Sequence, residues 1–441
     1  MSSASNTYRR GFCPSAGKPM QSGDGLLSRV QLLGGRLQVK DLQRLAEWAE
    51  TLAQPIIEIT SRGKLQLRGF SEISEAQFTQ QLQQQGLASA TPAAEAARKV
   101  LCSPLADLDP LAITDPYPIA KQLENRIVNQ ASLWQLPSKF LLVLDGGGVS
   151  SLSQLKADIC CRAIDTPQGL HFEILLATAT PKAINLGLCA ARECSEAIEA
   201  LLRCFIALNK QQGNHAQRLK DVLIDAQSTA AFKASLLSTT IKAQQADNIN
   251  KQEISPSAIT QNPHNAVLGK HKNWFACAPT FGVLSSDNAK AIVALALANN
   301  ITELRITPNK QLVFPNGSAA LGPALKQLDM IITAEDPRLS LHACPGSPSC
   351  LSGSSDTRGD ALRWAKACPE LFSTTANIHI SGCGKGCAHP RPSPLTLTAR
   401  QGRYDIIIND CADPIDDDHC LAKNIAPEEV PAILNRLTLS S

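Results

Sequence analysis

The sequence lacks a long apolar run and an excess of charge of either sign. The longest apolar stretch, AIVALALA from Ala291, is far too short to cross a bilayer and is typical of a buried helix. The formal net charge is +3, which gives no strong attraction to nucleic acid or to a membrane surface. With 441 residues, of which 44% are hydrophobic, the chain is expected to form two to four globular domains that bind neither nucleic acid nor a membrane.

Signals for export and for a nicotinamide cofactor are missing as well. No apolar run follows Arg9 and Arg10 near the start, so we do not expect a secretory signal and predict a cytoplasmic protein. No G-x-G-x-x-G segment follows a predicted strand and opens a helix, so the sequence shows no nicotinamide-binding fingerprint. The glycines at 146–148 do follow a predicted strand, but three plain glycines are weak evidence for a phosphate site.

Cysteine, in contrast, is abundant, with 15 residues. In a reducing compartment cysteines are more often metal ligands or small buried hydrophobes than disulfide partners, and the odd number argues against a fully paired framework. Most of them lie in apolar or helical surroundings, where we expect them to pack in the core. These include Cys160, Cys161, Cys189, Cys194, Cys204 and Cys277.

The chain repeats itself over a long stretch. GGRLQVKDLQRLAEWAETLAQPIIEITSRGKLQLRG, from Gly34, matches FGVLSSDNAKAIVALALANNITELRITPNKQLVFPN, from Phe281, without a gap. Each copy has apolar residues at helical spacing, then an alternating strand, a turn and a second short strand. This pattern predicts a ferredoxin-like half that occurs twice, so that the two copies are related by a pseudo-two-fold axis.

Four cysteines stand apart because they lie in two loops rich in glycine and proline. Cys344 and Cys350 lie in ACPGSPSCLSG, and Cys383 and Cys387 lie in SGCGKGCAHP, so the spacing is C-x5-C, 32 residues, C-x3-C. Four thiolates are the usual ligands of a cubane iron–sulfur cluster, and the glycines let the backbone approach it. The alternatives are a zinc site, which more often uses C-x2-C pairs, and four unrelated cysteines.

These observations predict an α+β protein in which each half-repeat is followed by an α/β domain. A polar stretch, KAQQADNINKQEISPSAITQNPHN, is typical of a linker and separates the two halves of the chain. The predicted domains are residues 1–85, the first ferredoxin-like half; 86–225, an α/β domain without cluster ligands; 226–272, the polar linker; 273–335, the second ferredoxin-like half; and 336–441, the iron–sulfur cluster domain.

The two half-repeats, EITSRGKLQLRG in the first of them and the C-x5-C and C-x3-C pairs resemble the sulfite and nitrite reductase family over nearly the whole chain. Within that family, RRGFCPSAGKPMQSGDGLLSRV and SGCGKGCAHP are similar to the branch that oxidises a tetrapyrrole in aerobic cobalamin biosynthesis. The resemblance implies a nitrite/sulfite reductase-like fold and a monooxygenase with a [4Fe–4S] cluster and a mononuclear non-haem iron. Its implied substrates are precorrin-3A and O2, and a partner reductase would supply electrons from NADH. The implied reaction is hydroxylation at C20 with formation of a γ-lactone.

The resemblance also implies that the two repeats line a tetrapyrrole cleft. Carboxylates on the tetrapyrrole need cations, and arginine can pair with a carboxylate through two hydrogen bonds. We therefore predict that Arg62, Arg68, Arg305 and Lys385 bind the substrate. His389 stands where sulfite and nitrite reductases typically have arginine, and we predict that it is catalytic, as a proton donor or an iron ligand.

Two alternatives use the same four cysteines. The first is a sulfite or nitrite reductase whose cluster is joined to siroheme; the pair His389-Pro390 and the N-terminal motif count against it. The second is a non-enzymatic iron–sulfur electron carrier. A chain of 441 residues with two repeats is larger than that task requires.

Overall fold

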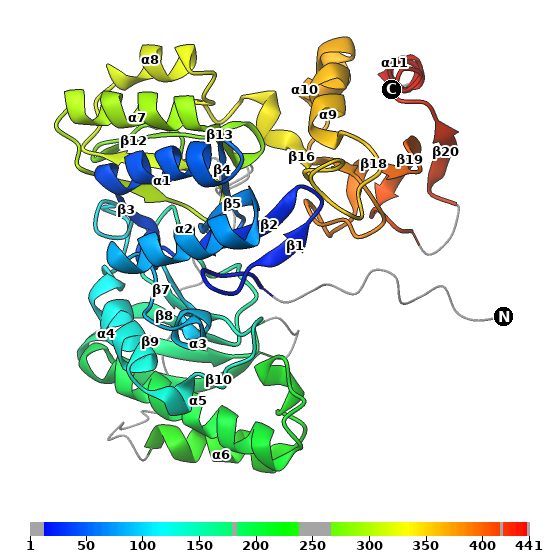
Figure 1. Cartoon of the computed structure of the whole chain (residues 1–441). Coiled ribbons are helices and arrows are strands. Elements are labelled where there is room, and N and C mark those ends of the chain that lie inside the picture. The colour runs from blue at the N-terminus through cyan, green and yellow to red at the C-terminus, as the bar shows by residue number, and fades with distance from the viewer. Residues whose placement is uncertain (1–12, 179–182, 238–265, 415–417, 439–441) are drawn as a thin grey trace.

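A computed structural model describes residues 13–178, 183–237, 266–414 and 418–438. In these residues the strands form four sheets of five strands each. Two sheets belong to the ferredoxin-like halves, and each of the other two belongs to an α/β domain. Figure 1 shows the halves packed against each other, with the first α/β domain on one side of them and the cluster domain on another.

The two ferredoxin-like halves have the same order of elements. The first contains β1 (Met20–Ser22), β2 (Gly25–Val30), β3 (Arg36–Gln38), α1 (Val39–Leu52), β4 (Ile56–Ile59), β5 (Leu65–Phe70) and α2 (Glu72–Gln84). The second contains β11 (Gly269–Lys270), β12 (Trp274–Cys277), β13 (Val283–Ser285), α7 (Ser286–Ala298), β14 (Glu303–Ile306), β15 (Leu312–Pro315) and α8 (Leu321–Gln327). The predicted repeat and the α+β fold class are therefore confirmed.

The halves exchange one short strand each. β13 of the second half pairs with β4 of the first, which gives the order β1-β2-β5-β4-β13; β3 of the first half pairs with β14, which gives β11-β12-β15-β14-β3. The exchanged strands each bury one leucine, Leu37 or Leu284, in a core to which both halves contribute. Helices α1 and α7 pack side by side over these sheets (Figure 1). The two halves thus fold as one body.

Two equivalent glycines allow the exchange. Gly35 and Gly282 both have a positive φ, and each lies against the backbone of the other half. A Cβ on Gly35 would lie 2.0 Å from the carbonyl oxygen of Ile306, and a Cβ on Gly282 would lie 2.8 Å from that of Ile59. Only glycine fits such an approach without moving the backbone.

The two α/β domains also share one topology. The first contains β6 (Val100–Cys102), α4 (Tyr117–Val128), β7 (Leu142–Asp145), β8 (Ile159–Thr166), β9 (Gly169–Leu176), β10 (Ile184–Ala190) and α5 (Cys194–Gln211). The cluster domain contains β16 (Leu341–Ala343), α9 (Thr357–Ala367), α10 (Pro369–Thr374), β17 (Ile378–Ser381), β18 (Ser393–Arg400), β19 (Arg403–Asp410), β20 (Cys420–Ile425) and α11 (Val430–Thr438). In each sheet three parallel strands are followed by two antiparallel ones.

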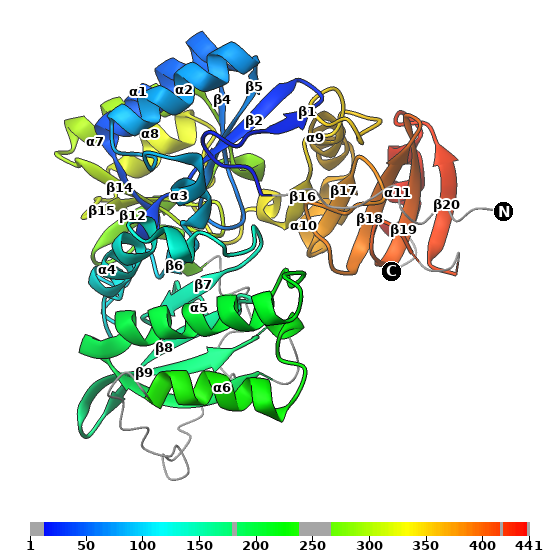
Figure 2. The same cartoon turned by 60° about the horizontal axis from the view of Figure 1, so that its bottom comes forward.

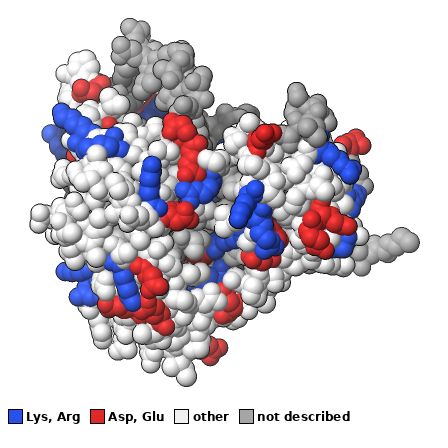
Figure 3. All heavy atoms as spheres, turned by 90° about the horizontal axis from the view of Figure 1, so that it is seen from above, with Lys and Arg blue, Asp and Glu red and all other residues white. Residues whose placement is uncertain are grey.

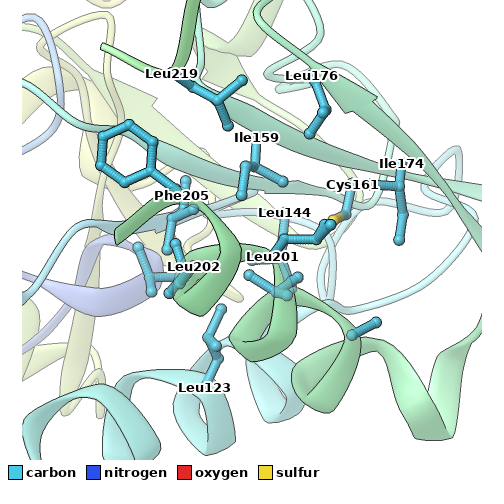
Figure 4. Packing of buried hydrophobic residues seen from close by; sticks show 14 of the residues in the cluster. Leu123, Leu144, Ile159, Cys161, Ile174, Leu176, Leu201, Leu202, Phe205 and Leu219 are labelled. Carbon is cyan, nitrogen blue, oxygen red and sulfur yellow. The ribbon is translucent and has the colours of Figure 1, made fainter. Parts of the chain in front are cut away.

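The core of the first α/β domain lies between its sheet and its helices. Leu123 of α4 and Leu201, Leu202 and Phe205 of α5 pack near the sheet residue Leu144 (Figure 4). Burial of such apolar side chains is the main force that holds a sheet against its helices. Of the cysteines expected to be buried, Cys161, Cys189 and Cys194 lie in this core and the partly buried Cys204 packs against it. Cys160 is buried in a smaller cluster of the same domain, and Cys277 is buried on β12 in the core of the ferredoxin-like halves.

The structure differs from the predicted linker at both of its ends. The range 226–272 begins with helix α6 (Ala226–Leu237), which buries Phe232 and Leu236 in the first α/β core. The same range ends with β11, which pairs with β12. The segment AQSTAAFKASLL is mostly alanine and other apolar residues, so the polar composition of the following stretch does not extend back into this helix. The stretch 238–265 lies outside the described residues. In the described part of the chain, no helix has the length and apolar character that a membrane span requires.

Candidate functional site: two cysteine loops and a cationic sheet face

The four predicted cluster cysteines lie in loops that follow adjacent parallel strands. Cys344 and Cys350 follow β16, and Cys383 and Cys387 follow β17. The carboxyl ends of parallel neighbours meet at one edge of a sheet, so the two loops lie close together. The N–H of Gly382 crosses between them and donates to the Cys344 sulfur at 3.2 Å. Burial raises the pKa of Cys383, and the nearby Cys344 and Cys350 raise it further.

Glycines form a cradle around these thiols. A Cβ on Gly382 would lie 3.2 Å from the Cα atoms of both Gly346 and Gly353, and 3.4 Å from the Cys344 sulfur. A Cβ on Gly353 would lie 2.7 Å from the Gly346 carbonyl carbon. The loops therefore pack backbone against backbone, which leaves room for a bulky inorganic group and lets peptide N–H groups reach its sulfurs.

The donor set fits a cluster better than a single ion. Among the described ranges, no group of three or more His, Cys, Asp or Glu side chains is arranged to hold one metal ion. A zinc site needs four donors around one centre. A cubane cluster binds each thiolate at a different iron, so its four sulfur ligands lie farther apart than the ligands of a single metal ion. For the predicted mononuclear iron, too, the described residues offer no preformed donor set.

The first α/β domain carries an equivalent pair of loops without thiols. Ser103 follows β6 as Cys344 follows β16, and 145–151 corresponds to 381–387, since β7 corresponds to β17. In this loop the fully buried Asp145 accepts hydrogen bonds from Ser103 (2.9 Å) and Ser151 (2.7 Å). A carboxylate and two hydroxyls thus close the place where the other half has thiols.

His389 belongs to a group of three histidines behind the cysteine loops, of which His379 and His389 are buried and His342 is partly buried. Its ring stacks on His342 at 4.7 Å between centroids and lies 6.1 Å from His379. Burial lowers the pKa of His342 to about 4 and that of His379 to about 3, and it also lowers the pKa of His389. All three imidazoles are therefore neutral near pH 7. His379 is 0% exposed, and neither ring nitrogen has a hydrogen-bond partner among the described residues.

Two of the predicted substrate arginines are buried and already paired. Arg68 is 2% exposed and binds Asp24 through Nε (2.6 Å) and Nη2 (3.2 Å). Arg305 is 3% exposed and binds Asp107 (2.8 Å) and Glu303. Their guanidinium groups have few donors left for a ligand, so this geometry disagrees with the prediction that they bind substrate. Each sits on the polar side of a strand that is covered by other parts of the chain, which the sequence alone does not reveal.

The other two predicted residues lie in accessible places. Arg62 is partly exposed in the turn between β4 and β5. Lys385 is partly exposed in the second cysteine loop, and its ammonium donates to Ser352 of the first loop at 2.6 Å. Lys385 thereby ties the two cysteine loops together, while Arg62 faces a different set of neighbours.

Arg62 is part of a cationic group whose two lysines, Lys64 and Lys99, were not predicted from the sequence. Burial, with repulsion from Lys99 and Arg29, lowers the pKa of Lys64 to about 7. Burial, with repulsion from Arg62 and Lys18, lowers the pKa of Lys99 to about 8, although Glu95 acts in the opposite direction. The alternation in KLQLRG, which sends Lys64, Gln66 and Arg68 to one face of β5, could have revealed part of this group.

The cationic group lies between the first ferredoxin-like half and the first α/β domain. Arg29 lies on β2. Arg62 and Lys64 lie in the turn just before β5, and Lys99 immediately precedes β6. Burial and mutual repulsion both disfavour the charged forms of these neighbouring cations. A bound carboxylate would relieve the repulsion, so the group favours binding of an anion. We define Arg29, Arg62, Lys64 and Lys99 as the cationic group.

Other surface features do not compete with this site. A cavity of about 310 Å³ lies between residues 337–340, α9 and α10, and none of the predicted site residues lines it. On the face drawn in Figure 3, basic and acidic side chains are interspersed, without a large area of one sign. This agrees with the small net charge.

The comparisons with known proteins agree with this geometry. The family model described as nitrite/sulfite reductase ferredoxin-like half domain matches residues 18–84. The model described as nitrite and sulphite reductase 4Fe-4S domain matches residues 93–240, which is the α/β domain without the thiol loops.

Relatives and a solved structure cover most of the chain. It is 30% identical over 411 residues to a precorrin-3B synthase from Sinorhizobium sp, covering 92% of this chain and 84% of that protein. It is 22% identical to a ferredoxin–nitrite reductase from Synechococcus elongatus, covering 86% and 77%. The NirA protein of Mycobacterium tuberculosis has the same fold, with a TM-score of 0.70, 19% identity, and coverage of 94% and 80%. The chain therefore belongs to the nitrite and sulphite reductase family of iron–sulfur oxidoreductases, on its precorrin-3B synthase branch.

Proposed function

We propose that this protein is a precorrin-3B synthase that acts as a monooxygenase. One atom of O2 is added at C20 of precorrin-3A, and the other is reduced to water by two electrons and two protons. The ring A acetate then closes the γ-lactone. Because the sequence shows no nicotinamide-binding fingerprint, we propose that a partner reductase delivers electrons from NADH.

The cationic group is the observation that carries the substrate assignment. A precorrin is fringed with carboxylates, and the group offers two arginines and two lysines on adjoining elements. Bound carboxylates would raise the lowered pKa values of Lys64 and Lys99 and keep both protonated near neutral pH. Binding and orientation of the macrocycle are therefore assigned to Arg29, Arg62, Lys64 and Lys99, in place of Arg68 and Arg305.

The cysteine loops would hold a [4Fe–4S] cluster through Cys344, Cys350, Cys383 and Cys387. When bound, such a cluster supplies single electrons. The protein's own contribution is to hold the thiols apart, to donate the Gly382 N–H, and to join the two loops through Lys385 and Ser352. Hydrogen bonds of this kind favour the thiolate form and tune electron transfer.

Of the two roles predicted for His389, proton donor and iron ligand, we propose the first, with the imidazole able to donate or accept a proton near the substrate. Its neutral imidazole has both a donor and an acceptor nitrogen. A neutral histidine offers no fixed positive charge, whereas the arginine that sulfite and nitrite reductases typically carry at this place does. This difference favours a substrate other than a small oxyanion.

Anaerobic purification followed by a visible spectrum tests the proposal, with iron and acid-labile sulfide quantified. A broad cluster absorbance without haem bands, and O2-dependent turnover of precorrin-3A when a reductase and NADH are supplied, would support it. Incorporation of one labelled oxygen atom per product molecule from ¹⁸O2 would confirm the monooxygenase step. A product whose new oxygen comes from water would contradict it.

A siroheme-dependent reductase is the second candidate, because the similarity to a nitrite reductase extends over 86% of the chain. Intense siroheme bands in the purified protein, with reduction of nitrite or sulfite by a reduced dye, would favour that function and overturn the first.

A further inference from the structure

We propose that the β1–β2 turn and Arg68 position the cysteine loop that carries Cys350, so that both halves of the chain hold the cluster. This inference rests on the proposed assignment of the cluster to the four cysteines. It makes Arg68 a positioning residue, which acts through the backbone of the loop and not through contact with the substrate.

The β1–β2 hairpin reaches out of the first half toward the cluster domain. In Figures 1 and 2 its tip lies next to the loops at the start of α9. Gly23, at this tip, donates its N–H to the carbonyl oxygen of Ser349 at 3.2 Å. A Cβ on Gly23 would lie 2.1 Å from the carbonyl oxygen of Pro348, so any larger residue would push the turn off the loop. The contact joins residues more than 320 positions apart.

Three donors converge on the Ser349 carbonyl, one residue before Cys350. Besides the Gly23 N–H, the Ser22 hydroxyl donates at 2.6 Å, and Nη2 of Arg68 donates as well. A carbonyl oxygen has two lone pairs and is usually satisfied by one or two donors. Three donors therefore fix the position of this peptide group strongly, and the adjoining Cys350 with it.

Arg68 is itself held rigidly. Asp24, from the same turn, binds two of its nitrogens, and Ser22 accepts a hydrogen bond from Nη2 at 2.7 Å. Nη1 lies 3.7 Å from Glu58 of β4. A buried arginine with this many charge-assisted contacts has little freedom, and the loss of its charge would leave Asp24 without a cationic partner.

A second connection reaches the other thiol of the same loop. Burial opposes ionisation of Glu58, but Arg358 and Arg68 outweigh it and lower the pKa of Glu58. Arg358, in the first turn of α9, pairs with Glu58 at 2.6 Å. The preceding residue, Thr357, donates to the carbonyl oxygen of Cys344 and lies 3.7 Å from its sulfur. The first half thus anchors both ends of the segment from Cys344 to α9.

Two measurable properties should depend on this contact. The buried charge of Arg68 favours addition of an electron to a neighbouring cluster, so its loss should make the cluster's midpoint potential more negative. A loosened loop should also admit solvent and oxygen to the cluster more readily. Neither property is expected to change when an arginine of similar burial is removed far from the loop.

The test uses the full-length protein purified anaerobically with its cluster. Arg68→Met combined with Asp24→Asn removes one charge of each sign and leaves Asp24 no unpaired charge, so we expect altered EPR g-values and bleaching in air that is faster by about tenfold. Arg68→Met alone, which leaves Asp24 charged, should in addition make the midpoint potential more negative. Ser22→Ala removes one donor only and should give a smaller change in the same direction. Arg68→Lys should retain the potential better than Arg68→Met because it keeps the charge.

The matched control is Arg305→Met combined with Asp107→Asn, which removes a buried arginine of the other ferredoxin-like sheet together with one of its partly exposed acidic partners. It should leave the potential and the EPR signal as in the native protein. If Ser22→Ala and Arg68→Met behave as this control does, while Cys350→Ala has lost the cluster, the positioning role is refuted and the cluster assignment stands. If Cys350→Ala retains the native cluster, the assignment itself fails, and the positioning role fails with it.

Discussion

The backbone N–H of Gly382 donates to the sulfur of Cys344 at 3.2 Å. At the equivalent place in the first half, the N–H of Gly146 donates to the hydroxyl of Ser103 at 2.9 Å. The duplicated scaffold thus offers the same backbone donor twice, once to a thiol and once to a hydroxyl. At this donor, the difference between the two sites lies in the side chain that accepts the hydrogen bond.

Replacing Cys344 by serine should therefore remove the cluster without unfolding the cluster domain. A hydroxyl fits beside this N–H in the first half, but it is a poor ligand for iron compared with a thiolate. We expect less than about a tenth of the native iron and sulfide, while the apo-protein melts within about 1 °C of native apo-protein, the shift expected for at most about 1 kcal/mol in a chain of this size. Cys368→Ser, at a buried position on the same domain, should show the opposite pattern: cluster retained and stability reduced.

The close approach at the exchanged strand predicts a stability difference between two glycines. Gly35 and Gly86 have similar positive φ angles, 63° and 69°, but only Gly35 has backbone atoms within 4 Å of an added Cβ. Gly86→Ala should cost about 1 kcal/mol for the left-handed backbone alone. Gly35→Ala should cost at least about 2 kcal/mol more, because the chain must move away from Ile306. Urea unfolding measures both, and equal values would show that the exchange tolerates expansion.

Substitutions of Arg62 and of Arg305 should have separate effects, one on tetrapyrrole binding and the other on stability. Arg62 is partly exposed and forms no ion pair with a described carboxylate, so Arg62→Met should change the unfolding free energy by less than about 0.5 kcal/mol. It should weaken binding of uroporphyrin, a stable polycarboxylate tetrapyrrole, by about tenfold. Arg305→Met should leave binding unchanged and destabilise by about 2 kcal/mol, since it removes a buried guanidinium that binds Asp107 and Glu303. Fluorescence titration and urea unfolding give the two quantities. The reverse pattern would restore Arg305 to the substrate site.

The lowered pKa values of Lys64 and Lys99 predict how anion binding depends on pH. Their folded-state values, about 7 and about 8, lie below the ordinary 10.5, so each lysine loses its proton as the pH rises through that range. A carboxylate ligand prefers the protonated form. Affinity for uroporphyrin should be highest below pH 7 and should fall by up to about tenfold per pH unit for each lysine above its pKa.

Stability of the ligand-free protein should change in the opposite direction. The unfolded chain binds more protons than the folded chain between pH 7 and 10.5, so the free energy of unfolding should rise with pH over this window. In Lys64→Gln both pH dependences should weaken. Lys326→Gln, at an exposed lysine of α8, is the matched control and should change neither. A flat pH profile in the native protein would remove the cationic group from the substrate site.

The sequence by itself determined the repeat and the cysteine loops. The segments that start at Gly34 and Phe281 match without a gap through a helix and two strands. Both copies have the same periodicity of apolar residues, and this local spacing decides which face of each element is buried. The loops around Cys344 and Cys383 were likewise visible from their glycines and spacing. These features depend on residues that are close together along the chain.

Only the tertiary structure decided which charged residues are free. Arg62 and Arg68 are the same residue type in one short segment, and the sequence does not distinguish them. In the structure Arg68 is buried against the carbonyl of Ser349, 281 residues away, while Arg62 remains partly exposed. Burial and ion pairing depend on segments that meet only when the chain has folded, such as the β1–β2 turn and the Cys350 loop. The exchange of β3 and β13 between the halves has the same origin, because a short strand pairs with whichever edge the fold brings beside it.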